Sequence, residues 1–505
     1  MNTAAFNPII LSLVTFIPAI GGALILLIPR RDRDIKVFAL VITLLAFVAS
    51  LHLPVHLHRN QPGFQFEIDQ PWLTSPNIHY HMGIDGISVW LVVLTTFLTP
   101  LCVLISWTSI HERVKEFFIL LLLLETALIG VFTSLDLFLF YFFWEATLIP
   151  MALLIGMYGH GRKVYAAVKY FLFTMIGSMF MLAAIIWLYV KTGSFDFAVI
   201  QNAIRSGAVP GFASAAQWLF LGFFVAFAVK VPLFPLHTWL PDAHVEAPTA
   251  GSVLLAGVLL KMGTYGLLRF NLGLFPDQAR RNASWIMVLA LIGIIYGALV
   301  SLVQPNLKKL IAYSSVSHLG FVVLGIFSFT TAGLNGAVFV MLAHGVATGG
   351  LFMLAGILYE RRHTYAISDF GGLASPMPKY AAFFLVTVLA SAGLPLMSGF
   401  IGEFLVLSGA FQARPVYGIL AATGVIWSAG YLLWMYQRVF YGQVTHEVNR
   451  TLPDINLREK TALVPIAVAA VVMGIAPLLW LGAIDPAVQA ALAPFTQLTA
   501  KVVGQ

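Results

Sequence analysis

Six ionisable side chains lie inside long apolar runs of this sequence, where lipid-facing helices rarely carry charge. They are two carboxylates, two lysines and two histidines: Glu145, Lys230, Lys261, His318, His344 and Glu403. At a rise of about 1.5 Å per residue, the first five stand near the middle of their runs, and Glu403 stands further along its own. Each such group costs about 2.5–3.5 kcal/mol in a bilayer, so a fold keeps several of them only where they face one another across water.

The mixture of residue types predicts proton transfer. A lysine that is desolvated, or that lies near a second cation, can release its proton near neutral pH. Histidine titrates in that range without help. A carboxylate held near a lysine stays charged and tunes its partner, so that each protonation step biases the next site. The row of six residues therefore predicts a relay that passes on both charge and protons.

Each of these residues also has a structural interpretation. Glu145 and Lys230 could form an ion pair that locks two helices together, and either histidine could be a neutral core donor bonded to a backbone carbonyl. His318 and His344 could ligate a haem, although no further haem motif accompanies them. Glu125, in LLLLETALIG, is a seventh charge in an apolar run. It has no assigned role and could serve a cavity or a partner chain.

The stretch 226–269 positions both lysines. Pro232 and Pro235 follow Lys230 directly, and because proline lacks a backbone donor they predict a helix break beside the charge. A second break is predicted at Pro395, inside the small-residue run SAGLPLMSGFIGE. Broken helices at membrane depth are tolerated mainly where they are buried or line a water-filled cavity. Polar side chains follow the first break: His237, Asp242, His244 and Glu246.

Composition places the chain in a membrane. Hydrophobic residues make up 60% of the 505 and charged residues only 10%, with a mean hydropathy of +0.90, whereas a soluble domain has about 25% charged residues. The net charge of +7 is not gathered into a basic stripe, so we expect no nucleic-acid partner. The single cysteine, Cys102, excludes an internal disulfide and a cysteine-held iron–sulfur cluster within this chain.

Apolar runs of about 20 residues predict an all-α membrane protein with about fourteen transmembrane helices. The predicted spans are 8–28, 36–55, 84–107, 117–134, 135–158, 165–190, 217–240, 249–269, 283–304, 308–329, 332–358, 380–405, 416–438 and 461–484. With the N-terminus outside, about 18 lysines and arginines fall in inside loops and about 8 in outside loops, which agrees with the positive-inside rule. Only the outside loop 269–281 runs against that rule.

The two proline-interrupted segments lie about five helices apart, a pattern typical of inverted-repeat transporters. It divides the chain into an N-terminal three-helix segment (1–116), a first five-helix repeat (117–269), a second five-helix repeat (283–438) and a C-terminal helix (461–484). The polar loop 56–82 lies outside the repeats. Its four histidines, in HLH and HYH, could bind a metal, but their alternation with no nearby cysteine favours an exposed strand.

Five stretches of the sequence resemble the M subunit of bacterial respiratory complex I, the proton-pumping NADH:quinone oxidoreductase. They are MGIDGISVWL, FYFFWEATLIPMALLIGMYG, KVPLFPLHTWLPDAHVEAPTAGSVLLAGVLLKMGTYGLLR, KKLIAYSSVSHLGFVVLGI and GLPLMSGFIGEFLVLSGAF. Related subunits of multi-subunit cation/proton antiporters share the glutamate and lysine positions. The motifs MGIDGIS and GEFLVLSGAF resemble the complex I subunit more than the antiporter type.

The resemblance implies fourteen transmembrane helices, two inverted five-helix repeats and discontinuous helices at the seventh and twelfth positions. It implies a pair of Glu145 with Lys230, a connecting lysine at Lys261, a polar axis through His318 and His344, and an outlet at Glu403. It also places three residues at the inside end of the first broken helix, where they could take up protons: His237, Asp242 and His244.

The resemblance further implies that this chain holds no cofactor and no metal. NADH, FMN, iron–sulfur clusters and quinone would belong to partner subunits. The partners would be other membrane-arm subunits, above all two antiporter-like neighbours, together with lipids. The location would be a bacterial cytoplasmic (inner) membrane, with the N-terminus in the periplasm.

We therefore expect a proton-translocating membrane-arm subunit of an NADH:quinone oxidoreductase. In this hypothesis a signal from a neighbouring subunit breaks the Glu145–Lys230 pair, and Lys230 then loses its proton towards the histidines and Glu403. One rival is a subunit of a cation/proton antiporter, which would use the same residues without redox chemistry. The other rival is a structural scaffold in which the buried charges only pin helices together.

Overall fold

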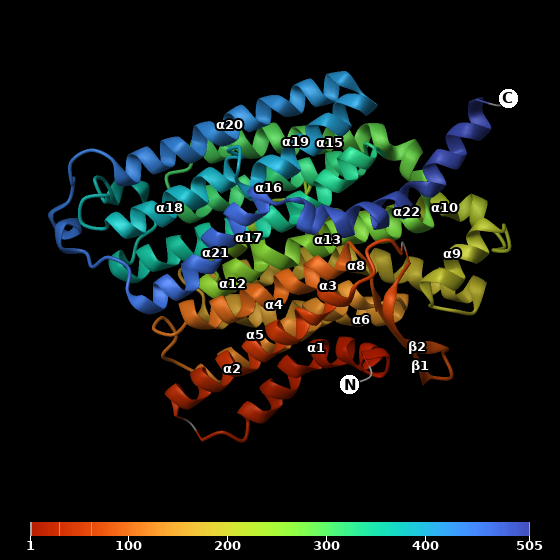
Figure 1. Cartoon of the computed structure of the whole chain (residues 1–505), viewed down its shortest axis with the longest axis horizontal. Coiled ribbons are helices and arrows are strands. Elements are labelled where there is room, and N and C mark those ends of the chain that lie inside the picture. Colours follow the sequence, from red (N-terminus) through yellow and green to blue (C-terminus); the bar gives the residue numbers. More distant parts are fainter. Residues whose placement is uncertain (1–2, 30, 62, 504–505) are drawn as a thin grey trace.

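The helices of the computed structural model share one main direction, and successive connections alternate between the two ends of the bundle (Figure 1). The structure describes residues 3–29, 31–61 and 63–503. A two-stranded antiparallel hairpin lies at one end, which we call the hairpin end. We call the other the opposite end. This arrangement is the all-α membrane fold that the apolar runs predicted, with one small hairpin added.

The first part of the chain forms α1 (Thr3–Ile25), α2 (Asp32–Ser50), α3 (His52–His56), β1 (Gln65–Leu73), β2 (Ile78–Ile84) and α4 (Ser88–Ile105). The first predicted repeat contains α5 (Val114–Thr133), α6 (Leu137–Ala146), α7 (Leu148–Tyr158), α8 (Lys163–Thr192), α9 (Phe197–Arg205), α10 (Phe212–Lys230), α11 (Trp239–Glu246), α12 (Thr249–Leu254), the π-helix η1 (Leu255–Leu259), α13 (Leu260–Gly266), the π-helix η2 (Leu267–Asn271) and α14 (Leu272–Leu274).

The second predicted repeat contains α15 (Pro276–Leu302), α16 (Leu307–Ile326), α17 (Thr331–Arg362), the 3-10 turn η3 (Ile367–Asp369), α18 (Pro378–Ser391), α19 (Ser398–Ala413) and α20 (Pro415–Phe440). The last part forms the 3-10 turn η4 (Glu447–Thr451), α21 (Leu457–Ile475) and α22 (Leu478–Val503).

Both predicted helix breaks are present. α10 ends at Lys230 and α11 begins at Trp239, so the chain leaves the helix across Pro232 and Pro235. α18 ends at Ser391 and α19 begins at Ser398, on either side of Pro395. The two broken helices run in opposite directions through the bundle, as an inverted repeat requires. The repeat boundaries themselves stay a prediction.

Within the described residues, twelve helices are long and apolar enough to cross a membrane. Two of the predicted spans that fall outside this set do so for simple reasons. The break divides the span 380–405 into α18 and α19, and α21 begins with the charged residues Arg458, Glu459 and Lys460. Each of the fourteen predicted ranges nevertheless contains a helix.

The predicted C-terminal helix over 461–484 differs from the structure. α21 stops at Ile475, and α22 starts at Leu478 and continues to Val503. Pro477 lies in the joint, and because it lacks a backbone donor it cannot continue the helical hydrogen bonds of α21. The apolar run continues across the joint, so hydropathy alone does not reveal the break.

Arg269, which begins the loop that ran against the positive-inside rule, is buried in an ion pair. Its Nη2 donates to Asp85 Oδ2 at 2.6 Å, and its guanidinium lies 4.8 Å from the ring centroid of Phe64. The Asp85 carboxylate also accepts from the backbone N–H groups of Ile87 and Ser88. Because its charge is paired, Arg269 adds no free charge to that loop, and it accounts for one of the loop's three arginines, the others being Arg280 and Arg281.

HYH lies in β2, as its alternation predicted, whereas HLH lies at the end of α3 and just after it, outside both strands. The two histidines of β2 form ion pairs. His79 Nδ1 lies 2.6 Å from Asp69 on the paired strand. His81 Nδ1 lies 2.5 Å from Asp196, the N-cap residue of α9, and its Nε2 lies 3.6 Å from Glu67. His81 therefore fastens the hairpin to the first predicted repeat.

We expect this fastening to weaken as pH rises. Burial lowers the pKa of His81, but the hydrogen bond and charge of Asp196, with the charges of Asp69 and Glu67, outweigh burial and raise the pKa above its usual value. A raised folded-state pKa gives stability that is fully present below the ordinary value of about 6.5 and is lost as pH rises through the raised value. Amide hydrogen exchange of β2, corrected for its intrinsic pH dependence, should accelerate across that window.

A His81→Gln variant should lose this pH dependence. A His79→Gln variant should keep it, because His79 pairs only within the hairpin. Equal pH dependence in both variants would contradict the assignment.

Candidate functional site

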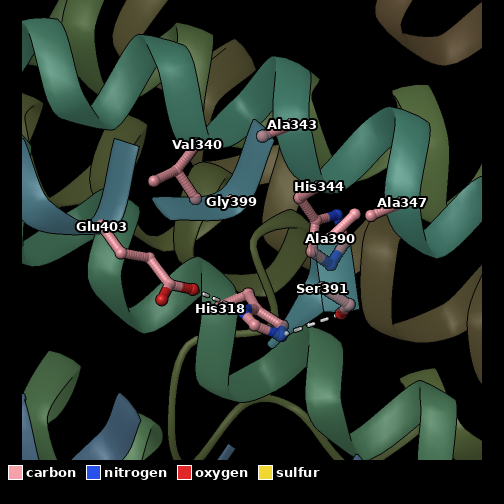
Figure 2. Close-up of a pocket in the computed structure, with 9 residues that line it drawn as sticks. All are labelled: His318, Val340, Ala343, His344, Ala347, Ala390, Ser391, Gly399 and Glu403. Atoms are coloured by element: carbon pink, nitrogen blue, oxygen red, sulfur yellow. Dashed lines mark hydrogen bonds and ion pairs between the residues drawn. The ribbon is translucent and has the colours of Figure 1, made fainter. Parts of the chain in front are cut away.

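His318, His344 and Glu403 meet in the second predicted repeat, although they come from three helices (Figure 2). His318 lies on α16, His344 on α17 and Glu403 on α19. His318 Nδ1 lies 2.9 Å from Glu403 Oε1, and the imidazole centroids of His318 and His344 are 5.7 Å apart. All three side chains are buried. The sequence placed these residues far apart, and the fold brings them into one cluster.

Both imidazoles line a small cavity. His318, His344, Ser391 and Glu403 are its polar lining residues, and it has room for about one water molecule. His318 Nε2 lies 3.5 Å from Ser391 Oγ and 3.4 Å from Tyr431 Oη. His344 Nε2 has no hydrogen-bond partner among the described residues. A buried polar atom beside a polar cavity is normally satisfied by water, which would bridge the gap between the two rings.

The second helix break supplies the room for Glu403. Gly393, in the break between α18 and α19, has φ +73°, a conformation that favours glycine. A Cβ on this residue would lie 2.9 Å from Glu403 Oε2. The break therefore lets backbone approach the carboxylate where an intact helix would carry side chains.

Lys261 joins this cluster from the first predicted repeat. Its Nζ lies 2.6 Å from His344 Nδ1 and also donates to the carbonyl oxygen of Ala256. Ala256 belongs to the π-helix η1, and such wide turns occur frequently at functional sites. When a protonated Lys261 donates to Nδ1, that nitrogen must offer a lone pair, so His344 is then neutral. The contact is a ready path for a proton from lysine to imidazole.

Glycine allows the two repeats to approach at this contact. A Cβ on Gly345, next to His344, would lie 2.9 Å from the carbonyl oxygen of Gly257 in η1. The backbones of α17 and η1 therefore pack directly, and Lys261 reaches across. The result is a continuous buried series: Lys261, His344, His318 and Glu403.

Lys230 is buried but lies outside this series. Its Nζ donates to Tyr170 Oη at 3.3 Å and lies 5.5 Å from the ring centroid of Trp144. The expected direct pair with Glu145 is absent: none of the ion pairs within 4.0 Å among the described residues joins these two side chains. The Glu145 charge still acts on Lys230 through space.

Glu145 was predicted to be buried, and this is wrong for the isolated chain. Its side chain is half-buried, and its Oε1 has no hydrogen-bond partner among the described residues. Phe142 and Ile149, on the same stretch, expose 48% and 60% of their surface, so this face lies on the outside of the bundle. Depth along a helix was read correctly, but depth does not say which face of the helix points outward.

The three residues after the first break do not form one cluster. Asp242 pairs with Lys169 at 2.6 Å near the opposite end. The His237 imidazole packs against the rings of Phe234 and Tyr296. His244 is fully buried and stacks on Phe352, and neither of its ring nitrogens has a hydrogen-bond partner among the described residues.

Glu125 is buried within this chain, so a contact with a partner chain is excluded for its carboxylate in this structure. Neither oxygen has a hydrogen-bond partner among the described residues. It lies on α5 near Thr99 and Cys102 of α4. It takes no part in the contacts of Lys261 with His344 or of His318 with Glu403.

Sequence reasoning missed three polar residues that contact the site: Tyr170, Ser391 and Tyr431. Ser391 had a weak signal, since it opens the small-residue run around Pro395. The two tyrosines had none, because aromatic residues are common in apolar helices. The described residues include no group of three or more His, Cys, Asp or Glu side chains arranged to hold a metal ion.

Comparison with family models matches most of the chain. Residues 134–428 match the model described as NADH:quinone oxidoreductase/Mrp antiporter, transmembrane region. Residues 35–131 match the model described as NADH-ubiquinone oxidoreductase chain 4, amino terminus. Together the two matches include the four residues of the buried series.

Comparison with individual proteins agrees. The chain is 44% identical, over 491 residues and 95% of each protein, to a protein of Rhodobacter capsulatus named NADH-quinone oxidoreductase subunit M. It superposes with a TM-score of 0.86 on a chain of respiratory complex I from Thermus thermophilus, at 34% identity, covering 96% of this chain and 100% of that one. A chain of the Mrp complex from Dietzia shares the fold, with a TM-score of 0.84 at 19% identity and 99% of both chains covered.

Proposed function

The chain belongs to the NADH:quinone oxidoreductase/Mrp antiporter family of membrane subunits, and from that premise we propose that its buried series is the proton path. It is a multi-pass, proton-translocating subunit of an NADH:quinone oxidoreductase complex, and other subunits of that complex are its partners. The observation that carries the proposal is the buried series of titratable groups from Lys261 to Glu403, with direct contacts at both ends and a water-sized cavity beside the two histidines.

The geometry supports a defined order of proton transfers. A protonated Lys261 donates to His344 Nδ1, and His344 then carries the proton to the cavity. A water in the cavity passes a proton to His318 Nε2, and His318 releases the proton on its Nδ1 to Glu403 Oε1. An imidazole that gains a proton at one nitrogen and loses one at the other transfers charge without moving.

Lys230 and Glu145 supply the control of this path in our proposal. Because Glu145 faces outward on the bundle, a neighbouring subunit can approach it and change its charge or position. Lys230 contacts Tyr170 and Trp144 and makes no ion pair with a carboxylate. Its position and protonation can therefore change when Glu145 changes. A shift of positive charge at Lys230 would raise or lower the tendency of Lys261 to keep its proton.

The remaining assignments follow from the same proposal. We place the hairpin end and the N-terminus outside a bacterial cytoplasmic membrane, and two antiporter-like subunits, with lipids, against the outer faces of the bundle. NADH, FMN, iron–sulfur clusters and quinone belong to partner subunits. Uptake of protons takes place at the opposite end, where Asp242, His237 and His244 lie.

A native gel of mildly solubilised membranes tests the assembly. We expect this chain to co-migrate with a high-mass band that oxidises NADH in the gel, because its relatives are named as subunits of an NADH-quinone oxidoreductase. Deleting the chain should remove that band. Migration in a smaller band without NADH oxidation, with salt-sensitive growth on deletion, would instead support the cation/proton antiporter.

A further inference from the structure

A polar cleft lies at the opposite end of the bundle, away from the buried series. It is formed where α8 begins, where α11 ends and where α15 turns into α16. The charged and amide side chains that line it are Arg162, Asp242, Glu246, Gln304, Asn306 and Lys309. Its carboxylates can collect protons from water, yet nothing described above connects the cleft to Lys261.

Lys308 lies directly behind this cleft and is 1% exposed. Its Nζ donates to the carbonyl oxygens of Ala247 at 2.5 Å and Val245 at 3.4 Å, and Val245 also lines the cleft. None of the ion pairs among the described residues includes Lys308. Its ammonium is therefore buried against two carbonyl oxygens and the ring of Tyr365, whose centroid lies 5.2 Å away, and the Glu246 charge acts on it from the cleft.

His244 continues from Lys308 towards the centre of the bundle. His244 directly precedes Val245, whose carbonyl oxygen Lys308 contacts, and the charges of Lys308 and Lys261 both act on its imidazole. The ring stacks on Phe352 of α17 at a centroid distance of 4.5 Å. Both ring nitrogens are buried without a hydrogen-bond partner among the described residues.

α17 supplies the next polar group. His344, Thr348 and Phe352 are spaced by four residues, so they share one face of the helix. Thr348 is fully buried, and its hydroxyl has no hydrogen-bond partner among the described residues. It stands one helical turn from His344 and one turn from the ring on which His244 stacks. Unsatisfied polar atoms along one helix face are normally bridged by ordered water.

We propose that Lys308, His244 and Thr348 form a proton-uptake branch that connects the opposite-end cleft to the Lys261–His344 contact. Lys308 takes a proton from the cleft side and releases it towards His244. The Thr348 hydroxyl and bridging water pass it along α17 to Lys261 and His344. The inference rests on the proposed function, because it names the route by which that path is loaded.

Lys308 also has a purely structural explanation. Its ammonium caps the last carbonyls of α11, and cations are favourable at helix C-termini. An arginine would keep this capping charge but would not release a proton. Lys308→Arg therefore separates the two roles, and Lys309→Arg is the matched control, since Lys309 is the adjacent lysine on the rim of the cleft.

The experiment measures proton translocation coupled to NADH oxidation in sealed membrane vesicles, with assembly checked on native gels. We expect Lys308→Arg to assemble and to lose about tenfold or more of the pumping rate, as removal of a proton-transferring group does. Lys309→Arg should stay within about twofold of wild type, since surface charge changes rarely matter. Thr348→Val, which removes only the hydroxyl, should lower pumping without changing assembly.

Wild-type pumping by both Lys308→Arg and Thr348→Val would overturn the branch. Lys261→Arg in the same vesicles separates this outcome from failure of the proposed function. If Lys261→Arg loses pumping while the two branch variants keep it, only the branch is wrong. If Lys261→Arg also pumps as wild type, the proposed path itself is wrong.

Discussion

A Lys261→Met enzyme should assemble and bind its partner subunits but lose most of its proton translocation. Methionine has nearly the length of lysine and is apolar, so it fits a site that is fully buried. It removes the group that lies 2.6 Å from His344 and the only lysine in the buried series. A positioned proton-transferring group raises the rate of its step by about 10²-fold or more. We therefore expect the rate of proton translocation coupled to NADH oxidation to fall by at least about tenfold. Pumping in sealed vesicles, relative to the amount of assembled complex, measures the effect.

Lys230→Met is the informative comparison for Lys261. Both lysines are buried, but Lys230 contacts Tyr170 rather than a histidine. If Lys230 acts only through its charge, the Lys230→Met enzyme should pump more slowly while the contacts of the buried series stay intact. An enzyme with Lys261→Met that pumps like wild type would mean that protons bypass His344.

Glu403→Gln should have the second largest effect. Glutamine keeps an oxygen within reach of His318 Nδ1, so the hydrogen bond and the packing beside Gly393 are retained. It cannot bind and release a proton, and it leaves a protonated His318 without its counter-ion. The expected loss of pumping is about tenfold, because a positioned acid–base group is removed. Steady-state pumping and the yield of assembled complex should be measured on the same preparation.

Glu125→Gln provides a matched control for this variant. Glu125 is as deeply buried as Glu403, but its neighbours Thr99 and Cys102 do not belong to the buried series. We expect its pumping to remain within about twofold of wild type, as for a change that touches no transferring group. Equal losses in the two variants would show that burial of a carboxylate, and not its place beside His318, determines the effect.

Much of the fold could be predicted from the sequence because lipid imposes a simple rule. Every backbone group that crosses a membrane must be satisfied within a helix, so apolar runs of sufficient length identify the helices. Prolines beside a charge or in a small-residue run indicated the two breaks, at Pro235 and Pro395, whereas Pro100 and Pro465 lie inside the intact helices α4 and α21. Hydropathy did not reveal the joint at Pro477, where an apolar run continues across two helices.

The candidate site was predicted less completely. An ionisable residue in an apolar run is conspicuous, and Lys261, His344, His318 and Glu403 were found in this way. Which of them touch depends on helix packing, such as the glycine contact between Gly345 and Gly257. Neither that contact nor the unpartnered hydroxyl of Thr348 leaves a mark in the sequence.

Glu145 illustrates the limit of depth along a helix. Its position near the middle of a run was read correctly, but its face of the helix lies on the outside of the isolated bundle. In an assembly of several membrane subunits, a neighbouring subunit can contact such a face. Rotation about a helix axis is fixed by the tertiary structure, and a single sequence with apolar residues all round does not specify it.

The number of protons translocated per NADH oxidised by a Lys261→Arg enzyme tests the central claim most directly. Arginine keeps the positive charge at Lys261 but does not give up its proton, so it separates charge from proton transfer. Our account predicts an assembled enzyme whose proton-to-NADH ratio in sealed vesicles lies clearly below that of wild type. A ratio equal to that of wild type would contradict a proton path through Lys261, His344, His318 and Glu403.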